Sequence, residues 1–196
     1  RFSNYDAYVV GSDQVWRSDY ALNIELFYLD FVGQATTKLS YAASFGKSEW
    51  GYNALQTKSC SKLLKRFHRV SVREESAVEL VRTKLGGLSD CVLDPTMIIP
   101  LNKYNDLICE GADNLFGKND LFCYVLDLSS EKRKLISMCA EKKSLNEVIF
   151  NDSRLDKDKM SIENWLQGIR DSRFIITDSF HGMVFSIIFE KDFIVI

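Results

Sequence analysis

The feature that most constrains the fold is a regular alternation of short, β-rich apolar runs with helical patterns along the chain. Such runs predict strands at residues 8–10, 39–43, 69–72, 91–93, 121–126, 146–150, 173–177 and 193–196. Apolar residues at helical spacing predict helices at residues 55–67, 76–85, 131–143, 162–170 and 181–189. Because a helix that joins two parallel strands covers a face of their sheet, this order predicts an α/β fold with parallel sheets.

One stretch, residues 100–119, is more polar and less regular than its surroundings. We therefore predict two Rossmann-like domains: residues 1–101 as part of the N-terminal domain, residues 102–119 as the interdomain crossing, and residues 120–196 as part of the C-terminal domain. The chain begins almost on one strand-like run and stops inside another. Since chain ends are usually exposed and frayed, we expect a chain truncated at both ends.

The composition argues against several classes of protein. With 25 basic and 27 acidic side chains the net charge is -2, which is unlike the basic footprint of a nucleic-acid-binding protein. No His, Asp or Glu set has metal-ligand spacing, and no apolar run reaches the length of about 18 residues that a membrane span needs. The five cysteines are scattered without a Cys-x-x-Cys pair, which favours a reducing compartment. Cys91 and Cys123 lie in apolar runs and are predicted to be buried.

The segment Thr177–Gly182 follows a predicted buried strand and opens a helix. Ser179 is placed to cap that helix, whose first amides and positive dipole end suit a phosphate or carboxylate. His181 lies in the first turn, where it could reach the same ligand. A structural role, with Ser179 only capping and His181 only packing, is an equal alternative on these residues alone.

Other polar groups also follow predicted strands, where open α/β sheets bind ligands. Gly11 is followed by Ser12, Asp13 and Gln14, which suit sugar hydroxyls, and Trp16 is placed either to stack on a sugar or to pack in the core. Arg73 ends a strand and is predicted either to bind an anionic group or to form a surface ion pair with Glu74 or Glu75. The segments 44–46 and 94–96 are predicted to be turns, with contact to a ligand as the alternative, and His68 is predicted to be structural.

Taken together, these motifs resemble the polysaccharide pyruvyl transferase family. The five that carry the resemblance occur in the family's order: Gly11-Ser-Asp-Gln-Val-Trp16, Tyr41-Ala-Ala-Ser-Phe-Gly46, Ser71-Val-Arg-Glu74, Val92-Leu-Asp-Pro-Thr96 and Asp178-Ser-Phe-His-Gly182. The resemblance implies a fold similar to GT-B glycosyltransferases, with an interdomain cleft. It also implies phosphoenolpyruvate as the donor, a sugar diol as the acceptor, and no metal or cofactor.

Residue by residue, the family's histidine matches His181 and the arginine of its Arg-Glu motif matches Arg73. Some branches of the family carry an arginine two residues before the histidine, where this chain has Ser179. The family's Gly/Asn-rich amino-terminal segment and its carboxy-terminal segment have no match here. These correspondences lead to one hypothesis about the site: His181 is the general acid–base, Arg73 and the amides near Ser179 hold the donor, and Asp13, Gln14 and Ser44 face the acceptor.

Two other functions stay open on these residues: a GT-B-like glycosyltransferase that uses a nucleotide sugar, and a non-catalytic sugar-binding module. The resemblance implies a saccharide or lipid-linked saccharide of a surface polysaccharide as partner. A cytoplasmic location follows, with peripheral association at the inner face of the membrane as an option. The acidic stretch 152–158, which also contains basic residues, is predicted to be a solvated loop.

Overall fold

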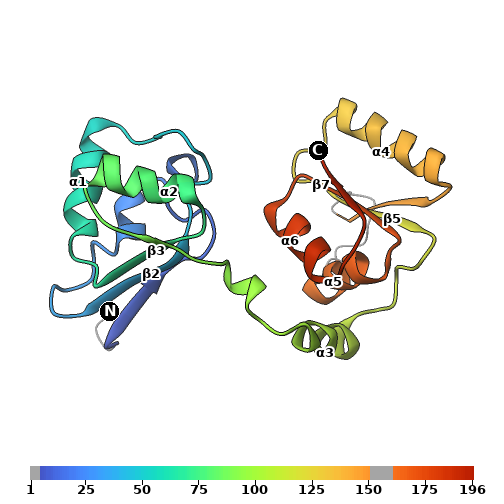
Figure 1. Ribbon diagram of the computed structural model, residues 1–196, viewed down its shortest axis with the longest axis horizontal. Helices are drawn as coiled ribbons and strands as arrows, with labels where there is room; N and C mark the ends of the chain where they lie inside the picture. The colour runs from blue at the N-terminus through green and yellow to red at the C-terminus, as the bar shows by residue number, and fades with distance from the viewer. Residues whose placement is uncertain (1–4, 151–160) are drawn as a thin grey trace. The chain divides into compact units, whose positions relative to one another are not determined.

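The computed structural model describes residues 5–150 and 161–196, and the chain divides into two compact units, Arg1–Ile98 and Ile99–Ile196 (Figure 1). Each unit holds one four-stranded sheet in which all neighbouring strands are parallel. The predicted α/β class with parallel sheets is therefore confirmed.

The first unit winds in one direction, with sheet order β1-β2-β3-β4. Its elements are β1 (Ala7–Val10), η1 (Ser18–Tyr20), η2 (Ile24–Tyr28), β2 (Thr37–Ala43), α1 (Ala54–Leu64), β3 (Arg69–Val72), α2 (Glu75–Leu80), η3 (Val81–Leu85), β4 (Asp90–Cys91) and η4 (Pro95–Met97). Connections between parallel strands are almost always right-handed, so winding in one direction places the helices on one face. A single buried cluster follows, in which α1, α2 and η2 pack on the strands (Figure 1).

The second unit winds in both directions, with sheet order β6-β5-β7-β8. Its elements are α3 (Leu101–Gly111), β5 (Asp120–Tyr124), α4 (Ser130–Lys143), β6 (Asn146–Ile149), α5 (Ile162–Asp171), β7 (Phe174–Thr177), α6 (Phe180–Ile188) and β8 (Phe193–Val195). One buried cluster joins α4 to one face of the sheet, and another joins α3, α5 and α6 to the other. The order in which strands are added to the sheet reverses between β5 and β7, and ligands of open α/β sheets bind outside the carboxyl ends of the strands at such a point.

The sequence predicts an irregular segment at residues 100–119, but the structure has helix α3 there. Tyr104 and Ile108, one turn apart, are buried in the cluster of the second unit. Spacing of four residues on one helix face was the signal for this element. The predicted crossing at residues 102–119 thus comprises α3 and the segment that leads into β5.

The two predictions about buried cysteines have different outcomes. Cys123 is buried in β5, as predicted, whereas the prediction for Cys91 is wrong because its residue is exposed. Cys91 ends β4, a strand of two residues that pairs with β3 and forms one edge of the sheet, so little packs on it. His68 is structural as predicted, since its Nδ1 accepts a hydrogen bond of 3.2 Å from the amide of Lys38. The acidic stretch 152–158 lies outside the described residues.

Candidate functional site

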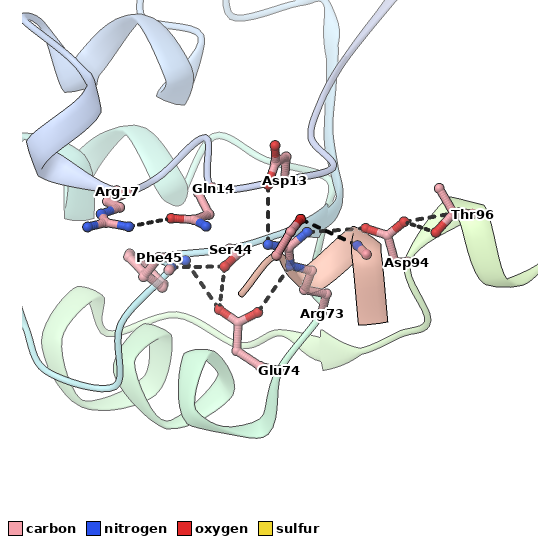
Figure 2. Close-up of polar contacts among 12 residues, drawn as sticks. Asp13, Gln14, Arg17, Ser44, Phe45, Arg73, Glu74, Asp94 and Thr96 are labelled. Carbon is pink, nitrogen blue, oxygen red and sulfur yellow. Dashed lines mark hydrogen bonds and ion pairs between the residues drawn. The ribbon is translucent and has the colours of Figure 1, made fainter. Parts of the chain in front are cut away.

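Polar groups gather at the carboxyl ends of β1, β2, β3 and the segment after β4 in the first unit (Figure 2). Gly11 begins the loop after β1 with φ of +111°, and a Cβ there would lie 2.2 Å from the carbonyl oxygen of Tyr41. Only glycine permits this close passage beside β2. The loop then brings Asp13 over the end of β2, where Asp13 pairs with Ala43 in an isolated parallel bridge.

Arg73 is the centre of this group, and its side chain is only 5% exposed. Its Nη2 donates to Asp13 at 3.2 Å, its Nη1 donates to Asp94 at 3.3 Å, and its Nε lies 3.7 Å from a Glu74 oxygen. A buried guanidinium needs such partners, because removing a charge from water is costly unless it is paired. The ion pair with Glu74, one of the alternatives that the sequence leaves open for Arg73, is present, but Arg73 does not lie at the surface.

The carboxylates around Arg73 are themselves held by other groups. The Asp94 side chain is 1% exposed and accepts from the amide and the hydroxyl of Thr96 at 3.0 and 2.8 Å. Glu74 accepts from the Ser44 hydroxyl at 2.8 Å and from the Phe45 amide at 3.3 Å. Asp13 is the exception, with 63% of its side chain exposed. We name this group, Asp13, Ser44, Arg73, Glu74 and Asp94, the arginine cluster.

The predicted residues of the first unit therefore have different surroundings. Arg73, Asp13 and Ser44 lie together in the arginine cluster. Gln14 instead accepts a hydrogen bond of 2.7 Å from Arg17, beside Gly46. The suggestion that Trp16 stacks on a sugar is wrong, because its ring is fully buried, lies 4.9 Å from Tyr28 in a stacked arrangement, and donates to the carbonyl of Phe27.

Glu74 and Asp94 were not assigned a role in the site from the sequence. Asp94 is predicted from the sequence as part of a turn, with ligand contact as the alternative, and it does cap η4 through Thr96. Its second role depends on the strand order, which places the end of β4 beside the end of β3. The sequence feature that could have identified Glu74 and Asp94 as site residues is their position just after the predicted strands 69–72 and 91–93.

In the second unit, the end of β7 and the start of α6 form a tight junction. The Thr177 hydroxyl donates to the carbonyl of Tyr124 at 2.7 Å and accepts from the amide of Ser179 at 3.0 Å. Ser179 caps α6 as predicted, with its hydroxyl accepting from the amide of Gly182 at 3.4 Å. A Cβ at position 182 would lie 2.2 Å from the Thr177 hydroxyl oxygen, so glycine lets the helix start this close to the strand.

Asp178, between these two residues, ties the junction to the neighbouring loop. Its carboxylate accepts from the amides of Leu126 and Asp127 at 2.7 and 3.3 Å and from the Lys132 ammonium at 2.7 Å. Burial raises the pKa of Asp178, but the hydrogen bonds from Lys132 and the two amides outweigh it and hold the pKa below 3.8. Asp178 therefore joins the segments after β5 and β7, on both sides of the point where the strand order reverses.

His181 and Ser179 line a pocket of about 370 Å³ at this edge of the sheet. Its wall is mostly aromatic, and its lining residues are Tyr124, Phe150, Ser161, Ile162, Trp165, Ser179, His181 and Phe185. Ser161 caps α5 in the way that Ser179 caps α6, so two helices begin at this pocket. We name it the histidine pocket.

Trp165 is a residue of this pocket that the sequence analysis missed. Its ring packs edge-on against Tyr124 and Phe185, with centroids 5.3 and 5.2 Å apart. Its indole nitrogen is buried, and no residue within the described ranges accepts a hydrogen bond from it. A buried donor without an acceptor is costly, so a ligand oxygen in the histidine pocket would relieve that cost.

The described residues show no group of three or more His, Cys, Asp or Glu side chains that could hold a metal ion. No helix in the described ranges has the length and apolar character to cross a membrane.

Comparison with known proteins gives one family. The family model described as polysaccharide pyruvyl transferase matches residues 1–196, the whole chain. No curated protein and no solved structure matches the chain. The chain therefore belongs to the polysaccharide pyruvyl transferase family and is an enzyme that transfers pyruvyl groups, with a saccharide as acceptor.

Proposed function

We propose, from its membership of the polysaccharide pyruvyl transferase family, that this enzyme forms a pyruvate ketal on a sugar and that phosphoenolpyruvate is the donor. The sugar would belong to a surface polysaccharide or to its precursor, including a lipid-linked one. The observation that carries the choice of donor is the histidine pocket, where an imidazole and the first turns of two helices meet an aromatic wall.

The charge of the donor fits the start of these helices. Phosphoenolpyruvate carries a phosphate and a carboxylate, and both are stabilised by free amides and by the positive end of a helix dipole. Ser161 and Ser179 mark the starts of α5 and α6 at the pocket. Ser179 stands where some relatives have an arginine, so backbone amides would supply part of the stabilisation that the arginine gives there.

The chemistry needs one proton donor near the enol carbon. In the proposed sequence, one sugar hydroxyl attacks C2 of phosphoenolpyruvate while C3 takes up a proton and becomes a methyl group. A second hydroxyl then displaces phosphate from C2, which closes the ketal, and the two hydroxyl protons balance the proton added to C3 and the one that leaves with phosphate. His181 is the proposed acid–base, since imidazole exchanges protons near neutral pH.

Arg73 is proposed to act on the same donor. The contacts of the arginine cluster suggest how, because Asp94 and Glu74 orient the guanidinium from buried or half-buried positions while Asp13 is mostly exposed. A phosphate or carboxylate of the donor that takes the place of Asp13 at Nη2 would replace one anion by another. Asp13, once released, would face the acceptor hydroxyls as a hydrogen-bond acceptor.

The acceptor assignments of Gln14 and Ser44 remain part of the proposal. Ser44 donates to Glu74 and Gln14 accepts from Arg17, so each would have to share or exchange that hydrogen bond with a sugar. The GT-B-like arrangement with a cleft, the cytoplasmic location, the association with the inner face of a membrane and the independence from metals and cofactors also remain predictions from the family resemblance.

A donor screen tests the proposal. The protein is incubated with a panel of oligosaccharides and lipid-linked sugars and with either phosphoenolpyruvate or nucleotide sugars, and products are identified by mass spectrometry. We expect a mass gain of one pyruvate less one water, with release of phosphate, only with phosphoenolpyruvate. Transfer of a hexose from a nucleotide sugar without any pyruvylated product would contradict it.

A further inference from the structure

A second pocket, of about 490 Å³, lies at the opposite edge of the second sheet from the histidine pocket. It is formed by the segment before β5, the end of α5, the segment before β7 and Lys191 before β8. These are the amino ends of the strands, whereas His181 follows the carboxyl end of β7. We name this second pocket the amino-edge pocket.

The amino-edge pocket is lined by more positive than negative side chains. The lining holds one carboxylate, Asp171, and four cationic side chains, Lys118, Arg170, Arg173 and Lys191. Arg170 and Asp171 neutralise each other through two hydrogen bonds of 2.7 and 2.8 Å. The positive charges of Lys118, Arg173 and Lys191 are therefore left without a matching charge in the lining.

Two of these cations make no side-chain hydrogen bond or ion pair within the described ranges, namely Lys118 and Arg173. A role in balancing the carboxyl-terminal dipole of α5 explains Arg170, which lies in its last turn, and Lys191, which donates to the carbonyl of Arg170 at 2.8 Å. It does not explain Lys118 or Arg173, which precede strands.

A buried hydroxyl in the same lining independently points to a ligand. Ser172 is fully buried, and its hydroxyl oxygen has no hydrogen-bond partner among the residues that the structure describes. Buried polar groups almost always have a partner, so this hydroxyl, in a residue that lines the pocket, is a group that a bound ligand would satisfy. The hydroxyl can donate to an anionic oxygen.

We propose that the amino-edge pocket binds a phosphorylated small molecule, with Lys118, Arg173 and Lys191 around the phosphate and the Ser172 hydroxyl donating to it. A volume of about 490 Å³ exceeds what a phosphate ion fills and is in the range of small-molecule sites, so the ligand carries an organic part of about sugar size. Half-buried Phe116 in the lining offers this part an apolar surface. The proposal uses residues of the second unit only and does not depend on pyruvyl transfer.

Isothermal titration calorimetry on the full chain tests this site with three probes: inorganic phosphate, a hexose phosphate and the free hexose. We expect the hexose phosphate to bind most tightly and the free hexose not to bind. The double variant Lys118→Gln/Arg173→Gln should bind the hexose phosphate at least tenfold more weakly, because two exposed cations are removed. Lys134→Gln, an exposed lysine on α4, is the matched control and should bind like the wild type.

Two further variants separate this site from the others. His181→Ala should keep wild-type affinity for the hexose phosphate even if it abolishes pyruvyl transfer. Ser172→Ala should weaken binding several-fold while leaving the melting temperature of the free protein equal or higher, since it removes an orphan hydroxyl. Wild-type affinity in the Lys118→Gln/Arg173→Gln variant, or equal affinity for inorganic phosphate and hexose phosphate, would overturn the proposal.

Discussion

The arginine cluster and the histidine pocket each lie at the carboxyl edge of a parallel sheet, but they differ in whether their buried polar groups have partners within the protein. In the arginine cluster, a nearly buried cation is surrounded by three carboxylates, two of which are held in turn by hydroxyl and amide groups. In the histidine pocket, the wall is aromatic and the indole N–H of Trp165 has no acceptor among the described residues.

The difference separates two kinds of contribution. Groups of the arginine cluster already have protein partners, so their loss should be seen first in the stability of the fold. In the histidine pocket the Trp165 N–H lacks an acceptor among the described residues, and His181 is the proposed acid–base, so the loss of either group should be seen first in turnover or in substrate binding. We therefore expect the arginine cluster to act as a structural support for Arg73, and the histidine pocket to be the place where substrate binds.

The largest expected effect is on turnover, from His181→Ala. Removing a general acid–base typically lowers the rate about 10²- to 10⁴-fold. The free energy of unfolding, measured by urea denaturation, should change by no more than about 1 kcal/mol. His68→Ala is the matched control, because His68 accepts a backbone hydrogen bond from Lys38 and should affect stability but not turnover. Pyruvyl transfer by His181→Ala within a few-fold of wild type would end the assignment.

Arg73→Met should cause the largest loss of stability. It leaves the Asp94 carboxylate, 1% exposed, without its cation, and breaking a buried pair in this way costs about 3–5 kcal/mol. Adding Asp94→Asn should recover part of the loss, because the remaining side chain is neutral and its oxygen can still accept from Thr96. Urea denaturation of the single and double variants measures both. A loss below about 1 kcal/mol in Arg73→Met would show that the cluster does not depend on its cation.

Asp178→Asn tests whether the second unit also has a charge-held support beside its pocket. Losing the charge on three hydrogen bonds should reduce the free energy of unfolding by about 1–3 kcal/mol at neutral pH. Because the pKa of Asp178 is lower in the folded protein than its ordinary 3.8, the stabilisation is present above pH 3.8 and is lost as the pH falls through the folded value. The difference between wild type and variant should therefore shrink in acid, and a difference that stays constant would argue against the charged form as its source.

Trp165→Phe should have the smallest effect, and that effect should be on substrate binding rather than on stability. It keeps an aromatic ring against Tyr124 and Phe185 but removes the orphan N–H, so stability should be unchanged or slightly higher. A lost hydrogen bond to the ligand of about 0.5–1.5 kcal/mol raises KM by up to about tenfold. Trp50→Phe is the control, since the Trp50 indole donates to Thr57 at 3.0 Å and its loss should lower stability without changing KM.

Much of the architecture could be predicted from local pattern. The apolar runs predict the strands, and Ser179, close after a predicted strand, is predicted as the cap of the following helix, which the structure confirms. Helix α3 is not predicted from the sequence because its polar positions outweigh the Tyr104–Ile108 spacing. The sequence does not decide between a core and a ligand-binding location for Trp16, because a loop residue has no periodic pattern.

What the sequence determined by itself is the class of fold, the family and the edge of each sheet where polar residues gather, because periodicity and strand-end chemistry are local. Only the tertiary structure decided which groups meet there. Arg73 finds Asp94 and Asp13 at separations of 21 and 60 residues, and the amino-edge pocket joins segments from Lys118 to Lys191. These contacts between residues far apart in the sequence depend on strand order, which is β1-β2-β3-β4 in one unit and β6-β5-β7-β8 in the other. Strand order follows from how whole faces bury their apolar surface, and no local pattern encodes it.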